Sequence, residues 1–216
     1  MLRTEALAEL RIVLADTQAP YAWSDDRLIG WMSLGQDQFC RDTGFFTDTV
    51  TYNISTVANT EAYAIDSRVI KVYDAWYGGT RLRRFYQDQR VVLPPSPGPP
   101  ISFQTDQQTG MITLWPAPDA VYTITLDVWR KSKKALTHKT LTVADGEFEI
   151  PEEFHYAPVE WAAHKALNDH DRELQDPTKS AEHKLNYNSI AKDGKRAFQQ
   201  ISGGVGDVIP NQLYVI

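Results

Sequence analysis

Apolar residues recur at helical spacing in the first part of the chain. Between residues 4 and 16, Leu7, Leu10 and Leu14 fall on one side of a helix. Thr4 precedes them, and a threonine hydroxyl can accept a hydrogen bond from the first free N–H groups of a helix. The pattern predicts a short amphipathic helix with Thr4 as its N-cap.

A second helix is expected over residues 24–44, where the boundary signals are stronger. Ser24 is a good N-cap, and the two aspartates that follow it suit the positive end of the helix dipole. Gly44 is placed to end the helix in a left-handed conformation. Gly35, inside the apolar face, predicts the close approach of another helix or chain.

From about residue 48 the apolar period changes from helical to two, which is typical of β-strands. Two strand-like runs are joined by Gly78 and Gly79, a two-residue hairpin signal. The proline-rich segment 93–100 is expected to be a stiff connector. Three more runs follow it, and they predict a meander in which the last strand directs four residues inward: Tyr122, Ile124, Leu126 and Val128.

Helical signals return at Pro151. Residues 151–157 are expected to form a short helical turn, Pro158 to open a helix that reaches about Asp169, and Asp176 to cap a last helix that begins at Pro177.

These segments together predict an α+β chain, with a helical bundle built from the N- and C-terminal helices and an inserted antiparallel β-sheet or small sandwich. The corresponding domains are a helical domain of residues 1–47 and 151–201, a β domain of residues 48–150, and a flexible C-terminal docking tail of residues 202–216.

The last helix and the tail carry the predicted interface. The apolar stripe of the helix is thin and interrupted, so it is expected to pack against a neighbouring chain. The tail follows a glycine-rich joint, and either docks on a partner or folds back onto a sheet edge of its own chain. The predicted interface residues are Leu185, Ile190, Phe198, Val208, Ile209, Leu213, Tyr214, Val215 and Ile216.

Composition narrows the classes of function. The 216 residues carry a formal net charge of -6, which argues against a protein whose main task is to grip nucleic acid. The single cysteine, Cys40, excludes an internal disulfide and is expected to pack inertly. No apolar run approaches the length of about 18 residues that a membrane helix needs, and no targeting segment is recognised.

Three of the five histidines lie between residues 151 and 171, which raises the question of a metal centre. His155 and His164 are nine residues apart with a proline between them, so the HExxH spacing of zinc hydrolases is absent. Glu160 and His164 lie one helical turn apart and are expected to pair on the helix surface. No nucleophile elbow or phosphate loop is present either, and we expect no catalytic site, no metal and no cofactor.

Three segments, in this order, resemble the head-to-tail adaptor, or connector, proteins of tailed bacteriophages. They are YAWSDDRLIGWMSLGQDQFCRDTG, GPPISFQTDQQTGMITLWPAPDAVYTITLDVWRK and IPEEFHYAPVEWAAHKALNDHDRELQDPTKSAEH, and the resemblance covers residues 3 to 198.

The resemblance implies a structural virion protein, made in the host cytoplasm, that forms a ring of twelve copies in the neck between capsid and tail. It implies contacts with the portal protein and with a tail or nozzle protein, and passage of the genome through the channel without specific binding. The histidines would then be structural. The alternative is a binding module in which Trp76, Tyr77 and Trp129 on the sheet hold a carbohydrate or another ligand.

Overall fold

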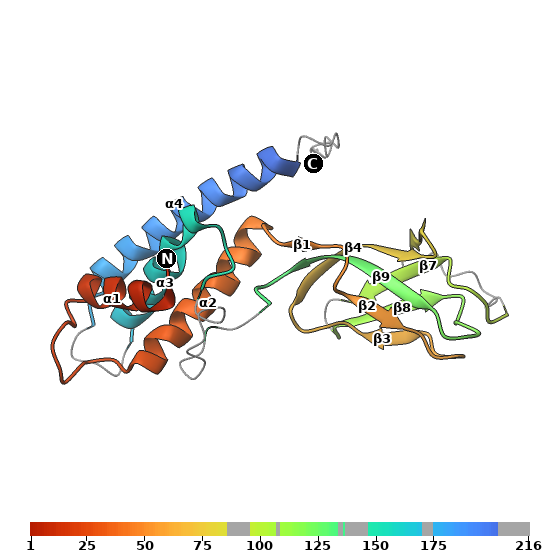
Figure 1. Cartoon of the computed structure of the whole chain (residues 1–216), viewed down its shortest axis with the longest axis horizontal. Coiled ribbons are helices and arrows are strands. Elements are labelled where there is room, and N and C mark those ends of the chain that lie inside the picture. Colours follow the sequence, from red (N-terminus) through yellow and green to blue (C-terminus); the bar gives the residue numbers. More distant parts are fainter. Residues whose placement is uncertain (86–95, 107–108, 134–135, 137–146, 170–174, 203–216) are drawn as a thin grey trace, which may run out of the picture. The chain divides into compact units, whose positions relative to one another are not determined.

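Two compact units make up the chain, one with residues Met1–Phe45 and Lys134–Ile216 and one with residues Phe46–Lys133. The computed structural model describes residues 1–85, 96–106, 109–133, 136, 147–169 and 175–202. These described residues form four α-helices, nine strands and a short 3-10 helix (Figure 1).

The first unit holds all the α-helices of the described residues. They are α1 (Arg3–Val13), α2 (Asp25–Thr43), α3 (Tyr156–Leu167) and α4 (Pro177–Ser202), and the 3-10 helix η3 (Glu152–Phe154) precedes α3. Helix α3 is the central element, because it packs most extensively against α4 and α2 and also contacts α1. Its buried positions are rich in alanine, including Ala162, Ala163 and Ala166, and such small side chains let neighbouring helices pack closely.

The boundary signals of α2 are confirmed. Ser24 is the N-cap and its hydroxyl accepts a hydrogen bond from the N–H of Arg27, while Gly44 ends the helix at φ +72°. The prediction for α1 is wrong in detail. The N-cap position belongs to Leu2, and the carboxylate of Glu5 accepts a hydrogen bond from the Leu2 N–H at 2.7 Å.

The predicted close approach at Gly35 is also confirmed. A Cβ atom at this position would lie 2.9 Å from the Cα of Pro158 and 2.9 Å from the Cβ of Trp161, so only glycine allows α2 and α3 to meet here. Gly194 plays the same part for α4, since a Cβ there would lie 2.6 Å from the ring of Phe39 on α2.

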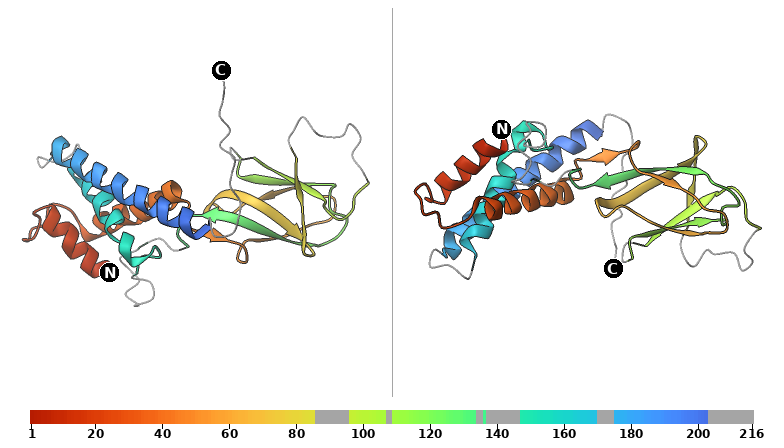
Figure 2. Two further views of the ribbon diagram at one scale, coloured as in Figure 1. Left: turned by 90° about the horizontal axis from the view of Figure 1, so that it is seen from above. Right: turned by 60° about the horizontal axis from the view of Figure 1, so that its bottom comes forward.

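The second unit is built from two sheets. One contains β1 (Thr47–Asp48), β9 (Thr123–Arg130), β4 (Val69–Tyr77) and β5 (Thr80–Arg81) in that order, with β2 (Asn53–Ser55) also paired to β9. The other has the order β3 (Ala62–Ala64), β8 (Met111–Trp115), β7 (Ser102–Asp106) and β6 (Arg83–Arg84). Both sheets supply side chains to one apolar core, so they pack face to face (Figure 2): Val72, Ala75, Leu82, Phe103, Ile112, Leu114, Ile124, Leu126 and Val128.

The hairpin at Gly78 and Gly79 is confirmed, with β4 and β5 antiparallel on either side and both glycines at positive φ. The predicted meander is wrong, because β9 does not follow β8 in its sheet. It crosses to the other sheet and pairs with β4. The inward positions Ile124, Leu126 and Val128 are nevertheless buried, since alternation along a strand depends on which face meets the core and not on which strand is the neighbour.

One side of the sandwich is closed by the chain itself. The N–H of Leu82 donates to Ala75 of the first sheet, and the N–H of Arg83 donates to Ile101 of the second sheet. Strands β5 and β6 are therefore consecutive pieces of one segment that passes between the sheets. Strand β6 pairs parallel to β7, so the second sheet is mixed.

The predicted fold class therefore needs correction. The predicted helical bundle with an inserted antiparallel sheet or small sandwich is wrong as a description of the chain. The described residues give a β-rich α+β protein whose nine strands form two sheets, with one parallel pair, and whose long helix α4 is C-terminal. The period of two identifies strands, but it does not specify how they divide between sheets or in which direction they pair.

Candidate functional site

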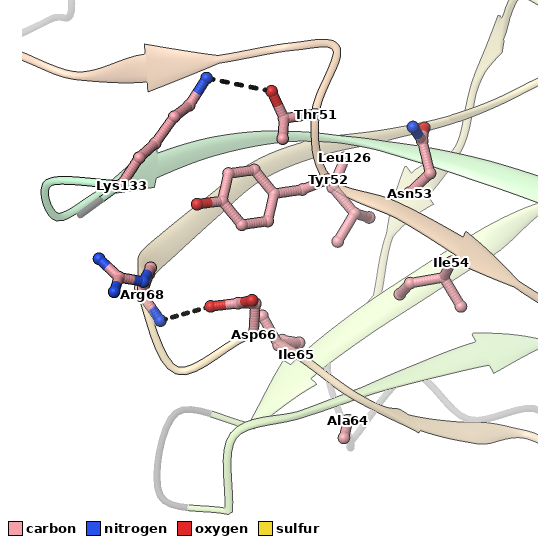
Figure 3. A pocket seen from close by; sticks show the side chains of 10 residues that line it. All are labelled: Thr51, Tyr52, Asn53, Ile54, Ala64, Ile65, Asp66, Arg68, Leu126 and Lys133. Carbon is pink, nitrogen blue, oxygen red and sulfur yellow. Dashed lines mark hydrogen bonds between the residues drawn. The ribbon is translucent and has the colours of Figure 1, made fainter. Parts of the chain in front are cut away.

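A cleft of about 660 Å³ opens in the β unit between the edge strands β2 and β3 (Figure 3). One wall comes from the start of β2 and from β9, and the other from β3 and the turn that follows it. The lining residues are Thr51, Tyr52, Asn53, Ile54, Ala64, Ile65, Asp66, Arg68, Leu126 and Lys133.

Tyr52 lies at the centre of the cleft, between Thr51 and Lys133 on one side and Asp66 and Arg68 on the other (Figure 3). Burial raises the pKa of its phenol, the charge of Arg130 opposes this, and the carboxylate of Asp66 adds to it. The phenol therefore stays protonated near neutral pH and can both donate and accept a hydrogen bond.

Arg68 supplies positive charge at the same end of the cleft. Its guanidinium donates to the carbonyl oxygen of Ser132, while its backbone N–H donates to the Asp66 carboxylate at 2.7 Å. A carbonyl partner leaves the charge of the guanidinium unneutralised. The Asp66 carboxylate lies at the same end, so this part of the cleft holds charges of both signs.

Asp48 holds in place the segment that leads into β2 and forms one wall of the cleft. Its carboxylate accepts hydrogen bonds from the N–H of Thr51 at 2.8 Å and of Val50 at 3.1 Å, and it pairs with Lys133 at 3.0 Å and with buried Arg130 at 3.4 Å. Burial alone would raise the pKa of Asp48. The hydrogen bonds from Thr51 and Lys133 outweigh burial, and hold that pKa well below its usual range.

The histidine-rich segment has structural partners instead of a reaction centre. His155 is buried, and its Nε2 lies 2.8 Å from the carbonyl oxygen of Ile150, which can only accept, so Nε2 carries the proton. Its Nδ1 lies 2.9 Å from the N-terminal ammonium of Met1 and accepts from it. His155 thus links η3 to the start of the chain.

His164 and Glu160 join α3 to α4, and not to each other as predicted. The Nδ1 of His164 lies 3.0 Å from the carbonyl oxygen of Ser180, to which it donates, and the Ser180 hydroxyl donates to the His164 carbonyl oxygen. Glu160 pairs with His183 at 2.7 Å. Tertiary partners on α4 outcompete the surface pair one turn away, because both side chains lie in the interface between the helices.

Within the described residues, no group of three or more histidine, cysteine, aspartate or glutamate side chains could hold a metal ion. His170, the third histidine of the segment, lies outside the described residues. Cys40 is fully buried in α2.

The predicted interface residues of α4 separate into two groups. Leu185 is 67% exposed, while Ile190 and Phe198 are half-buried, and the ring of Phe198 lies 6.2 Å from that of Phe45. The face that α4 buries is formed by Ser180, Tyr187, Ala191 and Gly194, and Phe198, four residues after Gly194, continues it, whereas Leu185 lies on the opposite side of the helix. The tail residues Val208, Ile209, Leu213, Tyr214, Val215 and Ile216 lie outside the described residues.

The three aromatic residues of the alternative binding module do not form one platform. Trp76 is 38% exposed on β4, and Trp129 is half-buried on β9, where it pairs with Lys71, far along the strand from Trp76. Tyr77 packs against the core and its ring lies 4.9 Å from that of Tyr122. A stacked sugar would need adjacent exposed rings.

The sequence does not predict the cleft, because the cleft depends on which strands are edges. The only local signal is that the short runs 53–55 and 62–64 contain neither charge nor proline, as Asn-Ile-Ser and Ala-Tyr-Ala. Pairing is what makes both of them edges, and pairing is set by distant parts of the chain.

None of the described helices is both long and apolar enough to cross a membrane. A family model described as SU10 adaptor protein matches residues 1–205, whereas no curated protein matches the chain. The match confirms the resemblance to phage head-to-tail adaptors that the three sequence segments indicate.

Proposed function

Because the chain belongs to the SU10 adaptor protein family, a family of phage head-to-tail adaptors, we propose that it forms a ring of twelve copies between portal and tail in the neck of the virion. The genome passes through the centre of this ring. The family match over residues 1–205 carries the proposal, and the role is structural, without catalysis.

Contacts between copies use surfaces that one chain leaves incomplete. On α4, Leu185 is exposed and lies outside the packed face of the helix, and half-buried Ile190 lies at the margin of that face. A ring closes when each copy presents two different, complementary faces, and these residues form one of them. The tail residues from Val208 to Ile216 provide further apolar anchors for a neighbouring copy or for the portal.

The domain assignment belongs to the same proposal. The β domain predicted over residues 48–150 is shortened, because Phe148 and Glu149 contact His155 and Gln36 of the helical unit. The proposal keeps the helical domain of residues 1–47 and 151–201 and treats residues 202–216 as a separate docking tail. In such an arrangement, the tail reaches a partner without disturbing either domain.

Weak affinity for DNA suits a channel, and charge supports it. The chain carries a net charge of -6, and several of its basic side chains are engaged within the protein. Arg81 pairs with Asp74 at 2.7 Å, and Arg130 and Lys133 pair with Asp48 at 3.4 Å and 3.0 Å. Fewer free cations mean fewer phosphate contacts and therefore less resistance to the moving genome.

Mixing the purified chain with its portal protein tests the proposal. We expect a complex of ring dimensions by light scattering and electron microscopy, weakened by Leu185→Asp and unaffected by Val50→Asp, which alters an equally exposed residue of the β unit. Failure to associate with the portal, or a virion reconstruction that places the chain outside the neck, would refute it.

A further inference from the structure

The sandwich has edge strands on two sides, and the two sides differ in whether these strands are protected against pairing with another chain. On one side, the segment of β5 and β6 passes from sheet to sheet and places Arg81, Arg83 and Arg84 at the edges. Charged side chains on an edge strand discourage pairing with another chain. That side is both closed and protected.

On the other side, both edges are open. Strand β2 pairs only with β9, and β3 pairs only with β8, within the described residues. The hydrogen bonds at Tyr52 and Thr56 point toward β9, so the backbone groups of Asn53 and Ser55 between them point away from the sheet.

Strand β3 repeats this arrangement. Glu61 and Ile65 bond to β8, which leaves the backbone of Ala62 and Ala64 facing outward. These edge residues are exposed and carry neither charge nor proline. The cleft lies between these two edges, with Ile54, Ile65 and Leu126 as its apolar lining.

An open, uncharged edge beside an apolar cleft fits an extended polypeptide. The added strand would take hydrogen bonds from the edge, and every second side chain would enter the cleft. The chain itself contains a suitable segment after α4: residues 211–216, Asn-Gln-Leu-Tyr-Val-Ile, are rich in residues that favour strands. Asp207 is the only charged side chain of the segment 203–216, so the segment is nearly uncharged, like the edges of β2 and β3.

We propose that the C-terminal segment of a second copy binds in this cleft as an extra strand on the edge of β2. Leu213 and Val215, which alternate along the segment, point into the cleft, and the backbone pairs with Asn53 and Ser55. The inference rests on the proposed ring, because a ring requires a surface on each copy that receives an element of the next. The glycines at residues 203, 204 and 206 provide the joint between helix and docked strand.

Disulfide trapping between two singly substituted full-length chains tests the proposal. One chain carries Asn53→Cys and the other carries Leu213→Cys, Tyr214→Cys or Val215→Cys; Cys40 is kept, since it is fully buried. Paired strands bring Cα atoms within disulfide range. We expect a cross-linked heterodimer with at least one of the three after mixing, and none when Val121→Cys, which is 75% exposed and outside the cleft, replaces Asn53→Cys.

A second variant separates edge pairing from simple proximity. Ser55→Pro removes an N–H that points away from β9, so the ladder between β2 and β9 is retained while the donor to the added strand is lost. We expect the yield of heterodimer to fall about tenfold, with an unchanged circular dichroism spectrum.

Each result decides a different point. A disulfide within one chain in the double variant Asn53→Cys/Leu213→Cys, at a concentration that gives no heterodimer, would assign the segment to its own cleft and overturn the proposal. Absence of any cross-link in a preparation that still assembles on the portal would overturn it too, and would leave the adaptor function intact. Loss of portal association by the unmodified chain would instead refute the proposed function.

Discussion

The hydroxyl group of Tyr187 offers a sharp test of how α4 is held. Tyr187 is fully buried, and its hydroxyl donates to the Asp42 carboxylate of α2 at 2.6 Å. The substitution Tyr187→Phe removes this one hydrogen bond and leaves the ring, which lies 5.0 Å from that of Trp161, in place. The expected effect is therefore electrostatic and creates no large cavity.

The magnitude follows from the two partners. A hydrogen bond to an ionised group contributes about 1.5–3 kcal/mol to stability. Asp42 is exposed and still accepts from Gln38 at 2.9 Å, so water and Gln38 replace part of the loss. We expect Tyr187→Phe to lower the free energy of unfolding by about 1.5 kcal/mol, which shifts a urea midpoint by roughly 0.75 M if the slope is about 2 kcal/mol/M.

The pH dependence gives a second signature. Burial, and then the bond to Asp42 and its negative charge, raise the pKa of Tyr187 far above its usual range. An unfolded tyrosine ionises near pH 10, so the contribution of the group is fully present below about pH 10 and is lost as the pH rises above it. The unmodified protein should therefore lose stability above pH 10 more steeply than Tyr187→Phe does.

Urea unfolding followed by circular dichroism at 222 nm, at pH 8 and at pH 10.5, measures both effects on the helices. Tyr156→Phe is the matched control, because Tyr156 is 50% exposed at the start of α3. Equal stability of Tyr187→Phe and the unmodified protein at pH 8, or an equal loss in the control, would contradict the reasoning.

Three further perturbations test other contacts. Gly35→Ala should cost about 1–3 kcal/mol through its clash with α3, whereas Gly30→Ala, with open space around it, should gain about 0.5–1 kcal/mol; thermal unfolding of both separates packing from helix propensity. Burial lowers the pKa of His155, so its neutral form stabilises the fold above about pH 6.5 and this contribution is lost as the pH falls below that value; His155→Gln should flatten an acid titration of stability. Asp48→Asn should cost about 3–5 kcal/mol by removing the carboxylate that pairs with buried Arg130, and an unchanged unfolding midpoint of the β unit would disprove this.

Local chemistry explains what the sequence predicts well. Ser24 and Gly44 act on backbone groups within a few residues of themselves, so the limits of α2 can be read from the sequence. The hairpin at Gly78 and Gly79 is equally local. Gly35 is predictive for a related reason, since a glycine on an apolar helix face has few uses other than close packing.

Choices between distant partners could not be predicted in this way. The run that becomes β9 has the same alternation whether it pairs with β8 or with β4, and only the assembled core selects β4. The buried face of α4 could not be predicted because Tyr187 and Gly194 look polar or neutral in a one-dimensional pattern. Their fit depends on Asp42 and Phe39, which precede them by some 150 residues.

The pairing of β1 with β9 has a mechanical consequence. Thr47, where the polypeptide enters the sandwich, lies opposite Trp129, close to where it leaves. A force that pulls on the two backbone connections of this unit would act on adjacent antiparallel strands at the same end. It would break the hydrogen bonds between them one after another. The salt bridges from Asp48 to Arg130 and Lys133 lie at this end, so they would have to break first.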